Sequence, residues 1–146
     1  MLKIVFSETI NASHTVVWRV ITNADDYPAW NRFVISCQST FEVGAPIIMR
    51  VKLLPFLTLR QKETVLRHTP HTLLEYGIRI PGLLVSSRQH RLTAITADTT
   101  EYESVFLLQG MLSPLVNLIL GAPLKRGFLE MTRGVAQQAH AIGHGD

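Results

Sequence analysis

The sequence has little cysteine and little charge, and each shortage excludes a class of protein. Cys37 is the one cysteine among 146 residues, which excludes an internal disulfide framework and a multi-cysteine metal site and predicts a reducing compartment, the cytoplasm. Charged residues amount to 17% and hydrophobic residues to 47%, which excludes an extended disordered chain. A chain of this length predicts one domain, expected over residues 1–142 with a disordered tail at 143–146.

The sequence also lacks an uninterrupted apolar run that suits a membrane helix. The stretch from Val105 to Leu124 is uncharged and about as long as the roughly 20 residues that a span needs. It is broken by Gln109-Gly110, Ser113-Pro114 and Gly121-Ala122-Pro123, which are typical of a strand end, a turn and a helix start. We therefore expect no membrane span.

Basic residues exceed acidic ones only slightly, 14 against 11, which gives a formal net charge of +3. Such a bias permits acidic partners without requiring them. One predicted sheet face gathers several basic residues, either as a nucleic-acid patch or as an ordinary solvated face. These residues are Arg50, Lys52, Arg60, Lys62 and Arg67. Interleaved acids and the scarcity of aromatic residues on those strands favour the solvated face, so we expect no nucleic-acid partner.

Hydrophobic periodicity predicts one strand, two short helices, six further strands and a long helix. Residues 3–10 alternate between apolar and polar, as a half-buried strand does. Ser13 is placed as the N-cap of an amphipathic helix that ends near Asn23, and residues 25–31 can hold a second short helix or a turn. Strand-like runs follow at 33–41, 46–54, 59–68, 73–80, 84–95 and 99–109, separated by turn residues.

The last segment is predicted to be a helix that covers the sheet. Ser113-Pro114 supplies an N-cap and a proline in the first turn. Leu124, Phe128 and Met131 then begin an apolar stripe, and Pro123 is expected to kink or restart the helix. Strands joined by short turns imply an antiparallel meander whose apolar face must be covered. The pattern therefore predicts an α+β fold.

Several short motifs resemble the START-like superfamily, also called SRPBCC, whose fold is the helix grip. The opening motifs are Ile10-Asn11-Ala12-Ser13, Tyr27-Pro28-Ala29-Trp30-Asn31 and Phe41-Glu42-Val43-Gly44. The later ones are Ile80-Pro81-Gly82-Leu83, Gln89-His90-Arg91-Leu92 and Gln109-Gly110-Met111-Leu112-Ser113-Pro114. The pattern is most similar to the small bacterial polyketide cyclase/dehydrase-like branch. The resemblance implies a curved antiparallel sheet of about seven strands wrapped around a long C-terminal helix, with two short helices after the first strand.

The same resemblance implies a ligand cavity between the sheet and the terminal helix. It leaves the chemistry open, because the superfamily hosts cyclases, dehydratases, lipid carriers and hormone receptors. Many relatives carry a glutamate four residues before the glycine that matches Gly110, where this chain has Phe106. The resemblance therefore implies that a carboxylate is missing from the pocket.

Alternation along the strands selects the side chains that should face this cavity, and the terminal helix should close it. The candidate ligand-binding residues are Met49, Val51, Tyr76, Ile78, Arg88, His90, Tyr102, Ser104, Phe106, Leu108, Phe128 and Met131. No catalytic residue is assigned, and neither a metal nor a cofactor is expected. His68 and His71 flank a proline turn without the spacing of metal ligands, and Cys37 is expected to pack as a small apolar residue.

Arg88 and His90 have two interpretations. If they lie on the inward face of their strand, they orient the polar end of a mainly apolar ligand. Arg88 would then need an acceptor, because an unpaired buried guanidinium costs several kcal/mol, and Glu63 or Glu75 is a candidate. In the other interpretation, Arg88 and His90 are edge or surface residues.

Three functions are compatible with the sequence. The first is the binding of a small, mainly hydrophobic molecule such as a lipid, a polyketide or an aromatic metabolite. The second is a cyclase or dehydratase-like enzyme, in which His90 or a tyrosine exchanges a proton with an enolisable substrate and Arg88 stabilises the oxyanion. The third is a protein-interaction module, and the chain is either a monomer or a homodimer. Because the sequence shows no paired carboxylates and no nucleophile motif, binding is favoured.

Overall fold

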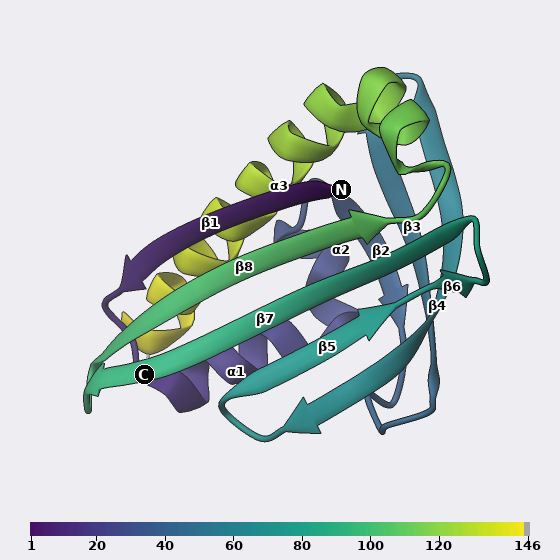
Figure 1. The fold of residues 1–146 in the computed structure, drawn as a ribbon. Helices are drawn as coiled ribbons and strands as arrows, with labels where there is room; N and C mark the ends of the chain where they lie inside the picture. Colours follow the sequence, from purple (N-terminus) through teal and green to yellow (C-terminus); the bar gives the residue numbers. More distant parts are fainter. Residues whose placement is uncertain (145–146) are drawn as a thin grey trace.

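The alternating runs of the sequence form one curved sheet that wraps around a long helix in the computed structural model, which describes residues 1–144 (Figure 1). The elements in chain order are β1 (Leu2–Ile10), α1 (His14–Thr22), the 3-10 turn η1 (Ala24–Asp26), α2 (Tyr27–Trp30), β2 (Val34–Gln38), β3 (Pro46–Leu54), β4 (Leu57–Thr69), β5 (Leu73–Gly77), β6 (Arg79–Ile80), β7 (Leu84–Thr96), β8 (Thr99–Gln109) and α3 (Ser113–His144). This architecture is the helix grip, as predicted.

Every strand pair of the described sheet is antiparallel. The spatial order is β1-β8-β7-β5-β4-β3-β2, and the two-residue strand β6 pairs with β7. Apart from the short β6, consecutive strands from β2 onward are neighbours, which confirms the predicted meander. The first strand departs from this rule, since β1 lies beside β8 with Leu2 opposite Leu108 and Ile10 opposite Thr100.

The predicted strand at 73–80 is divided into β5 and β6 at Ile78. The Ile78 backbone N–H donates to the Ser86 hydroxyl at 3.0 Å, and the Ile78 carbonyl accepts from the Ser86 N–H at 2.9 Å. The neighbouring strands approach so closely here that a Cβ on Gly77 would lie 1.9 Å from the Ser86 carbonyl oxygen. Glycine is therefore required at this position, and the close approach bends the sheet beside the cavity.

Local capping places the short helices. The Ser13 hydroxyl accepts from the Val16 N–H at 3.2 Å, so Ser13 is the N-cap of α1 as predicted, and Asn23 is its C-cap. The expected second helix is η1 followed by α2, with Pro28 in the first turn of α2.

Helix α3 differs from the prediction at two places. It continues through Pro123, because the carbonyl left without a donor belongs to Ile119, a residue that is 63% exposed and open to water. It also continues through Gly143, where the tail was expected to begin, since His140 Nε2 accepts from the Asn11 N–H at 3.1 Å and attaches these turns to the end of β1. Residues 145–146 of the predicted tail lie outside the described residues.

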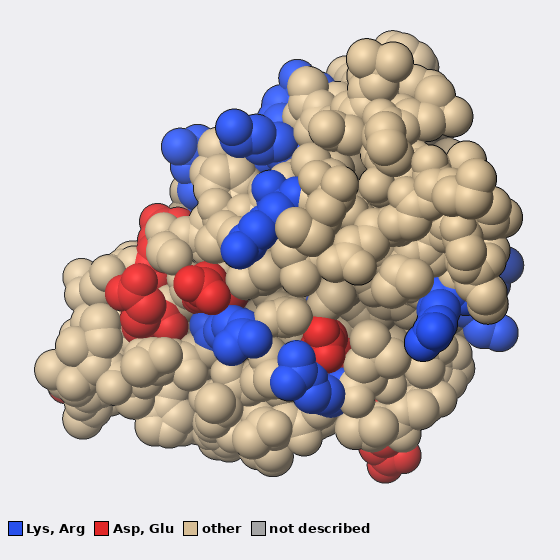
Figure 2. Space-filling view, in the orientation of Figure 1, with Lys and Arg blue, Asp and Glu red and all other residues tan. Residues whose placement is uncertain are grey.

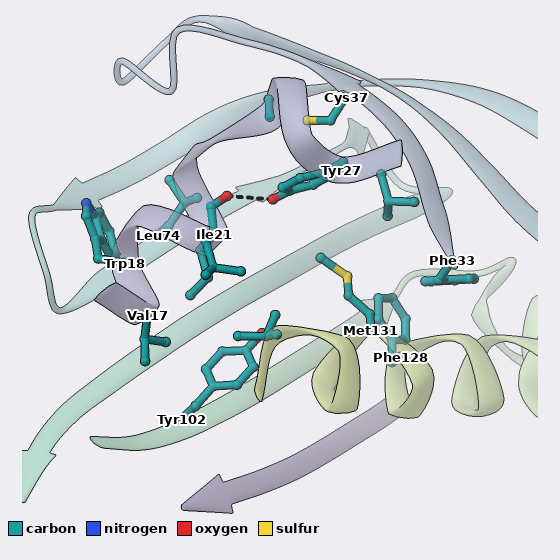
Figure 3. Packing of buried hydrophobic residues seen from close by; sticks show 14 of the residues in the cluster. Val17, Trp18, Ile21, Tyr27, Phe33, Cys37, Leu74, Tyr102, Phe128 and Met131 are labelled. Atoms are coloured by element: carbon teal, nitrogen blue, oxygen red, sulfur yellow. Dashed lines mark hydrogen bonds between the residues drawn. The ribbon is translucent and has the colours of Figure 1, made fainter. Parts of the chain in front are cut away.

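The core fills the space between the concave face of the sheet and the helices (Figure 3). Tyr27 is 1% exposed and its hydroxyl donates to the Ile21 carbonyl at 2.6 Å, which fixes α2 to α1. Met131 of α3 is fully buried, and the Phe33 and Phe128 rings pack edge to face with centroids 4.9 Å apart. Each such side chain stabilises the fold by about 1.5–3 kcal/mol. Trp18 belongs to this core, as predicted, at 7% exposed.

The two faces of the sheet are those that alternation predicts. Met49 and Val51 of β3 are buried, while the five basic residues named above are exposed on the convex face. On β7, Arg88 and His90 are 3% and 0% exposed, so their interpretation as surface residues is wrong. No helix within residues 1–144 is long and apolar enough to cross a membrane.

Candidate ligand-binding site

A cavity of about 140 Å³ lies between the concave face of the sheet and α3. Its wall is mainly apolar and receives side chains from α3 and from strands on both sides of the sheet. The polar residues of the wall are Gln61, Glu63, Tyr76, Ser86 and Arg88. The apolar ones are Phe33, Val34, Met49, Val51, Leu53, Leu59, Ile78, Leu84, Phe106, Leu108, Val116, Leu120, Leu124 and Phe128.

Most of the predicted site residues line this cavity, and the others lie directly behind its wall. Lining residues are Met49, Val51, Tyr76, Ile78, Arg88, Phe106, Leu108 and Phe128. Residues that do not line it are His90, Tyr102, Ser104 and Met131, which are at most 1% exposed and contact Arg88 or Tyr76 or their partners. The structure therefore divides the predicted set into a cavity wall and a buried supporting layer.

Some lining residues were not predicted. On α3, Val116, Leu120 and Leu124 precede Phe128 at intervals of four residues, so the apolar stripe could have been extended backward to find them. On β4, Leu59, Gln61 and Glu63 alternate with residues that are also polar, so periodicity did not distinguish the two faces of this strand.

The Arg88 guanidinium lies in the cavity wall and is held by neutral groups. Its Nη1 donates to the Ser104 hydroxyl at 2.6 Å, its Nη2 lies 3.5 Å from the Met131 sulfur, and its Cζ lies 4.8 Å from the centre of the Phe128 ring. The buried Nε has no hydrogen-bond partner among the described residues. No carboxylate of residues 1–144 lies within 4 Å of the Arg88 guanidinium, because the salt bridge of the described residues joins Arg67 to Glu75. The positive charge is fixed in place but is not neutralised.

Glu75 is not the partner of Arg88, because it points to the opposite face of β5 from Tyr76. It accepts from Arg67 Nε at 2.7 Å, from the Gln89 amide at 2.9 Å and from the Ser87 hydroxyl. Burial opposes its ionisation, but the hydrogen bonds from Arg67, Ser87 and Gln89 outweigh that effect and hold the pKa of Glu75 below its ordinary value. This pairing belongs to the convex face.

Glu63 supplies the cavity carboxylate that the resemblance had implied to be missing. Phe106 does line the cavity, but Glu63 lines it from β4. Burial raises the pKa of Glu63 to about 7, although the positive charge of Arg88 acts in the opposite direction. The expectation was wrong because it considered one strand position, whereas a carboxyl group can enter the same cavity from another strand.

The stability of the protein is expected to fall as pH rises toward 7 because of Glu63. Its pKa is raised in the folded state, so its contribution is present below the ordinary value of 4.5 and is lost as pH rises through about 7. In urea unfolding at pH 8, Glu63→Gln should be more stable than wild type by about 1–3 kcal/mol. The expected difference is modest because Glu63 is partly exposed and water screens its charge. At pH 4 the two should be equal. An identical pH dependence for both proteins would contradict this account.

His90 is buried and forms one hydrogen bond with each of two tyrosines. Its Nε2 lies 3.1 Å from the Tyr76 hydroxyl and its Nδ1 lies 2.7 Å from the Tyr102 hydroxyl. Burial, reinforced by the charge of Arg88, lowers the pKa of His90 well below its ordinary value, so the imidazole is neutral and one nitrogen donates while the other accepts. His90 can reach the cavity only through Tyr76, whose pKa burial raises. Direct proton exchange between His90 and a ligand is excluded by this geometry.

Cys37 is 4% exposed, and burial raises the pKa of its thiol to about 12, with Glu63 acting in the same direction. Because the thiolate is the reactive form, alkylation of the native protein by iodoacetamide at pH 8 should be about 100-fold slower than alkylation of the urea-unfolded protein. Mass spectrometry of timed samples measures both rates. Rapid stoichiometric labelling of the folded protein would show that the thiol is accessible and ionised.

His68 and His71 belong to no metal-binding cluster of the described residues. His68 and His71 pack against the Trp18 ring, with centroid distances of 5.4 and 6.2 Å. Within residues 1–144 there is no group of three or more histidine, cysteine, aspartate or glutamate side chains arranged to hold a metal ion.

The fold and the cavity define a START-like protein of the SRPBCC superfamily. The sequence profile described as polyketide cyclase/dehydrase and lipid transport matches residues 1–139, and the chain belongs to that family. A search of curated protein sequences found no match.

Solved structures share the fold at low sequence identity. The protein TTHA0849 from Thermus thermophilus superposes with a TM-score of 0.75 at 9% identity, over 97% of this chain and 99% of that one. The Zhui aromatase/cyclase from Streptomyces sp. R1128 gives 0.72 at 14% identity, over 95% and 93%. A START superfamily protein from Mycobacterium smegmatis gives 0.69 at 12% identity, over 92% and 97%. These likenesses establish the fold alone.

Proposed function

We propose that the protein binds a small, mainly apolar molecule that carries an anionic oxygen, and that it sequesters or carries this molecule in the cavity between the sheet and α3. One observation carries the proposal. Arg88 places a charged guanidinium in a mainly apolar wall, with no carboxylate of the described residues within 4 Å of it.

The energetics of Arg88 support a ligand rather than a structural role. A buried guanidinium contributes little to stability unless it is paired, and hydrophobic replacements of such groups are often neutral or stabilising. A carboxylate, phenolate or enolate in the cavity would supply the missing charge and accept from the free Nε–H. The neutral contacts to Ser104, Met131 and Phe128 keep the guanidinium oriented before the ligand arrives.

The size of the cavity limits the ligand. About 140 Å³ is close to the roughly 150 Å³ of an engineered apolar cavity that holds benzene, so one aromatic ring or a short alkyl chain can be accommodated. Sites for larger molecules occupy roughly 300–1,000 Å³. A polyketide or a two-chain lipid would therefore require the first turns of α3 to move away, and an aromatic acid is the class that the observed shape favours.

Native mass spectrometry of the gently purified protein, followed by denaturing extraction, tests the proposal. A stoichiometric adduct that is acidic and mainly apolar supports it. If the purified protein is empty, the Tm is measured with benzoate and with benzyl alcohol, because a ligand that binds the folded protein raises Tm. An empty protein that benzoate does not stabilise would refute the proposal.

Glu63 favours a second function in the same cavity, a cyclase or dehydratase-like enzyme. A carboxyl group whose pKa is about 7 is suited to accept and return a proton near neutral pH, and Arg88 can stabilise the enolate that forms. Deuterium incorporation into phenylacetone in heavy water measures this activity. Catalysed exchange that disappears in Glu63→Gln would support it, and exchange at the buffer rate with wild type would exclude it for this probe.

A further inference from the structure

Three separate stretches of the chain contain no charged residue, namely 53–59, 80–87 and 104–124. They form the β3–β4 turn, the β6–β7 turn, and the end of β8 with the first turns of α3. All three lie at the same end of the molecule, on the upper right of Figure 1. Contacts connect the second and third stretches, since the Leu112 N–H donates to the Leu83 carbonyl at 3.0 Å and a Cβ on Gly110 would lie 2.4 Å from that carbonyl oxygen.

These stretches expose large apolar side chains. Phe56, Leu118 and Met111 are 87%, 83% and 79% exposed, and most of the exposed large hydrophobic residues of the described chain lie here. We call this surface the apolar tip, made of Phe56, Ile80, Leu83, Val85, Met111, Leu112, Leu115, Leu118 and Ile119. Contiguous exposed apolar surface of this kind is uncommon on a soluble monomer and marks an interaction site.

The charges that border the apolar tip are nearly all basic. The first charged residues on either side of the three stretches are Lys52 and Arg60, Arg79 and Arg88, and Glu103 and Lys125. Arg88 is buried in the cavity wall, and Glu103 lies in mid-sheet opposite Ser7 and Arg91. The remaining four are exposed and form a basic collar. Figure 2 shows the tan tip at the upper right, with blue groups beside it and red groups confined to the middle and lower parts of the view.

We infer that the apolar tip docks on an anionic lipid bilayer, with its apolar side chains among the acyl chains and the basic collar at the phosphate groups. An apolar surface bordered by lysine and arginine is the pattern of peripheral membrane binding. A second copy of the chain is a poorer occupant, because pairing two tips would bring the like-charged collars of both copies together. Docking of the tip does not depend on the ligand proposed above.

The apolar tip also adjoins the cavity. Leu53, Leu84 and Leu120 line the cavity, and one comes from each of the three uncharged stretches. The same turns of α3 expose Leu115, Leu118 and Ile119 and direct Val116 and Leu120 toward the cavity. A docked molecule therefore presents this end of its cavity to the bilayer, so an apolar ligand can pass between them with little exposure to water.

Vesicle co-sedimentation tests the inference. Wild type should sediment with phosphatidylcholine vesicles that contain phosphatidylglycerol, and binding should weaken about tenfold when the anionic lipid is omitted or the salt concentration is raised. Leu118→Glu should reduce binding about tenfold, because it places a charge in the tip. Val43→Glu is the matched control, since Val43 is 65% exposed in the turn before β3, at the end of that strand remote from the tip, and it should bind as wild type does.

The collar is tested in the same assay by Lys125→Glu, with Lys62→Glu on the convex face as its control. Lys125→Glu should weaken binding several-fold, and Lys62→Glu should not. The inference is overturned if wild type does not bind the anionic vesicles, or if Leu118→Glu and Val43→Glu bind equally. It is also overturned if light scattering shows a dimer that Leu118→Glu dissociates while no vesicle binding occurs, because the tip would then be an interface between two copies.

Discussion

Arg88→Met should lose binding of small aromatic carboxylates while the folded state keeps nearly all of its stability. Truncation of one partner of a buried charge pair costs about 2–5 kcal/mol of binding free energy, which corresponds to a loss of at least thirtyfold in affinity. The unliganded protein loses the hydrogen bond to Ser104 and the contacts with Met131 and Phe128. It also loses two hydrogen bonds of 3.4 Å to backbone carbonyls and an interaction with the Tyr102 hydroxyl, while methionine fills much of the same apolar space. We therefore expect the free energy of unfolding to fall by no more than about 1 kcal/mol.

Calorimetric titration with benzoate and urea unfolding measure the two effects. Arg91→Met is the matched control, because Arg91 lies on the same strand but is exposed on the convex face, so both binding and stability should be unchanged. Benzyl alcohol, which has the same ring without the anionic oxygen, should not distinguish wild type from Arg88→Met. Equal benzoate affinity in the two proteins would show that Arg88 does not bind the acid group.

His90→Leu should destabilise the protein by about 2–4 kcal/mol without directly removing a ligand contact. The substitution leaves the buried Tyr76 hydroxyl without its partner at 3.1 Å, and an unsatisfied buried hydroxyl costs about 1–3 kcal/mol in addition to the lost packing. Tyr102 is less affected, because Arg88 and Ser104 also interact with its hydroxyl.

A double variant separates the hydrogen bond from the packing. His90→Leu combined with Tyr76→Phe removes the unsatisfied hydroxyl and should recover about half of the lost stability in urea unfolding. If the double variant is no more stable than His90→Leu, the hydrogen bond between His90 and Tyr76 contributes little. A fully stable His90→Leu protein would show that neither the hydrogen bond nor the packing of His90 contributes to stability.

The inner face of the sheet was predictable because alternation is strong on most strands. On β3, apolar residues alternate with Arg50 and Lys52, and on β8 the acids Glu101 and Glu103 mark the outward positions. The same two-residue alternation on β7 predicts that Arg88 and His90 lie on the inner face with Leu92. Both proved to be buried.

The rest of the site could not be predicted from the periodicity of single strands. Glu63 lies on β4, where residues on both faces are polar, so nothing in the sequence distinguished the inner face. The separation of Arg88 in the wall from His90 behind it depends on where the curved sheet meets α3, and that is a property of the tertiary structure. The pairing of β1 with β8 connects opposite ends of the sequence, which local patterns do not encode.

The extent of α3 was underestimated for a related reason. Pro123 and Gly143 are helix breakers by intrinsic propensity, but tertiary contacts and water satisfy the backbone at both places. The uncharged first turns of α3 were predicted as the start of the helix that covers the sheet, and no exposed apolar surface was expected there. These turns expose apolar residues on one side and line the cavity on the other. That arrangement depends on the tertiary structure, which brings the three uncharged stretches to one end of the molecule.

The Nε–H resonance of Arg88 in ¹H–¹⁵N NMR spectra gives the most direct test of the central claim, that an anionic oxygen of an apolar ligand is bound at this guanidinium. The resonance is identified by its absence from Arg88→Met. Because the Nε–H has no partner in the described structure, addition of benzoate should shift its proton signal downfield, whereas benzyl alcohol should leave it nearly unchanged. An unchanged Nε–H signal at benzoate concentrations that saturate the protein would contradict the account.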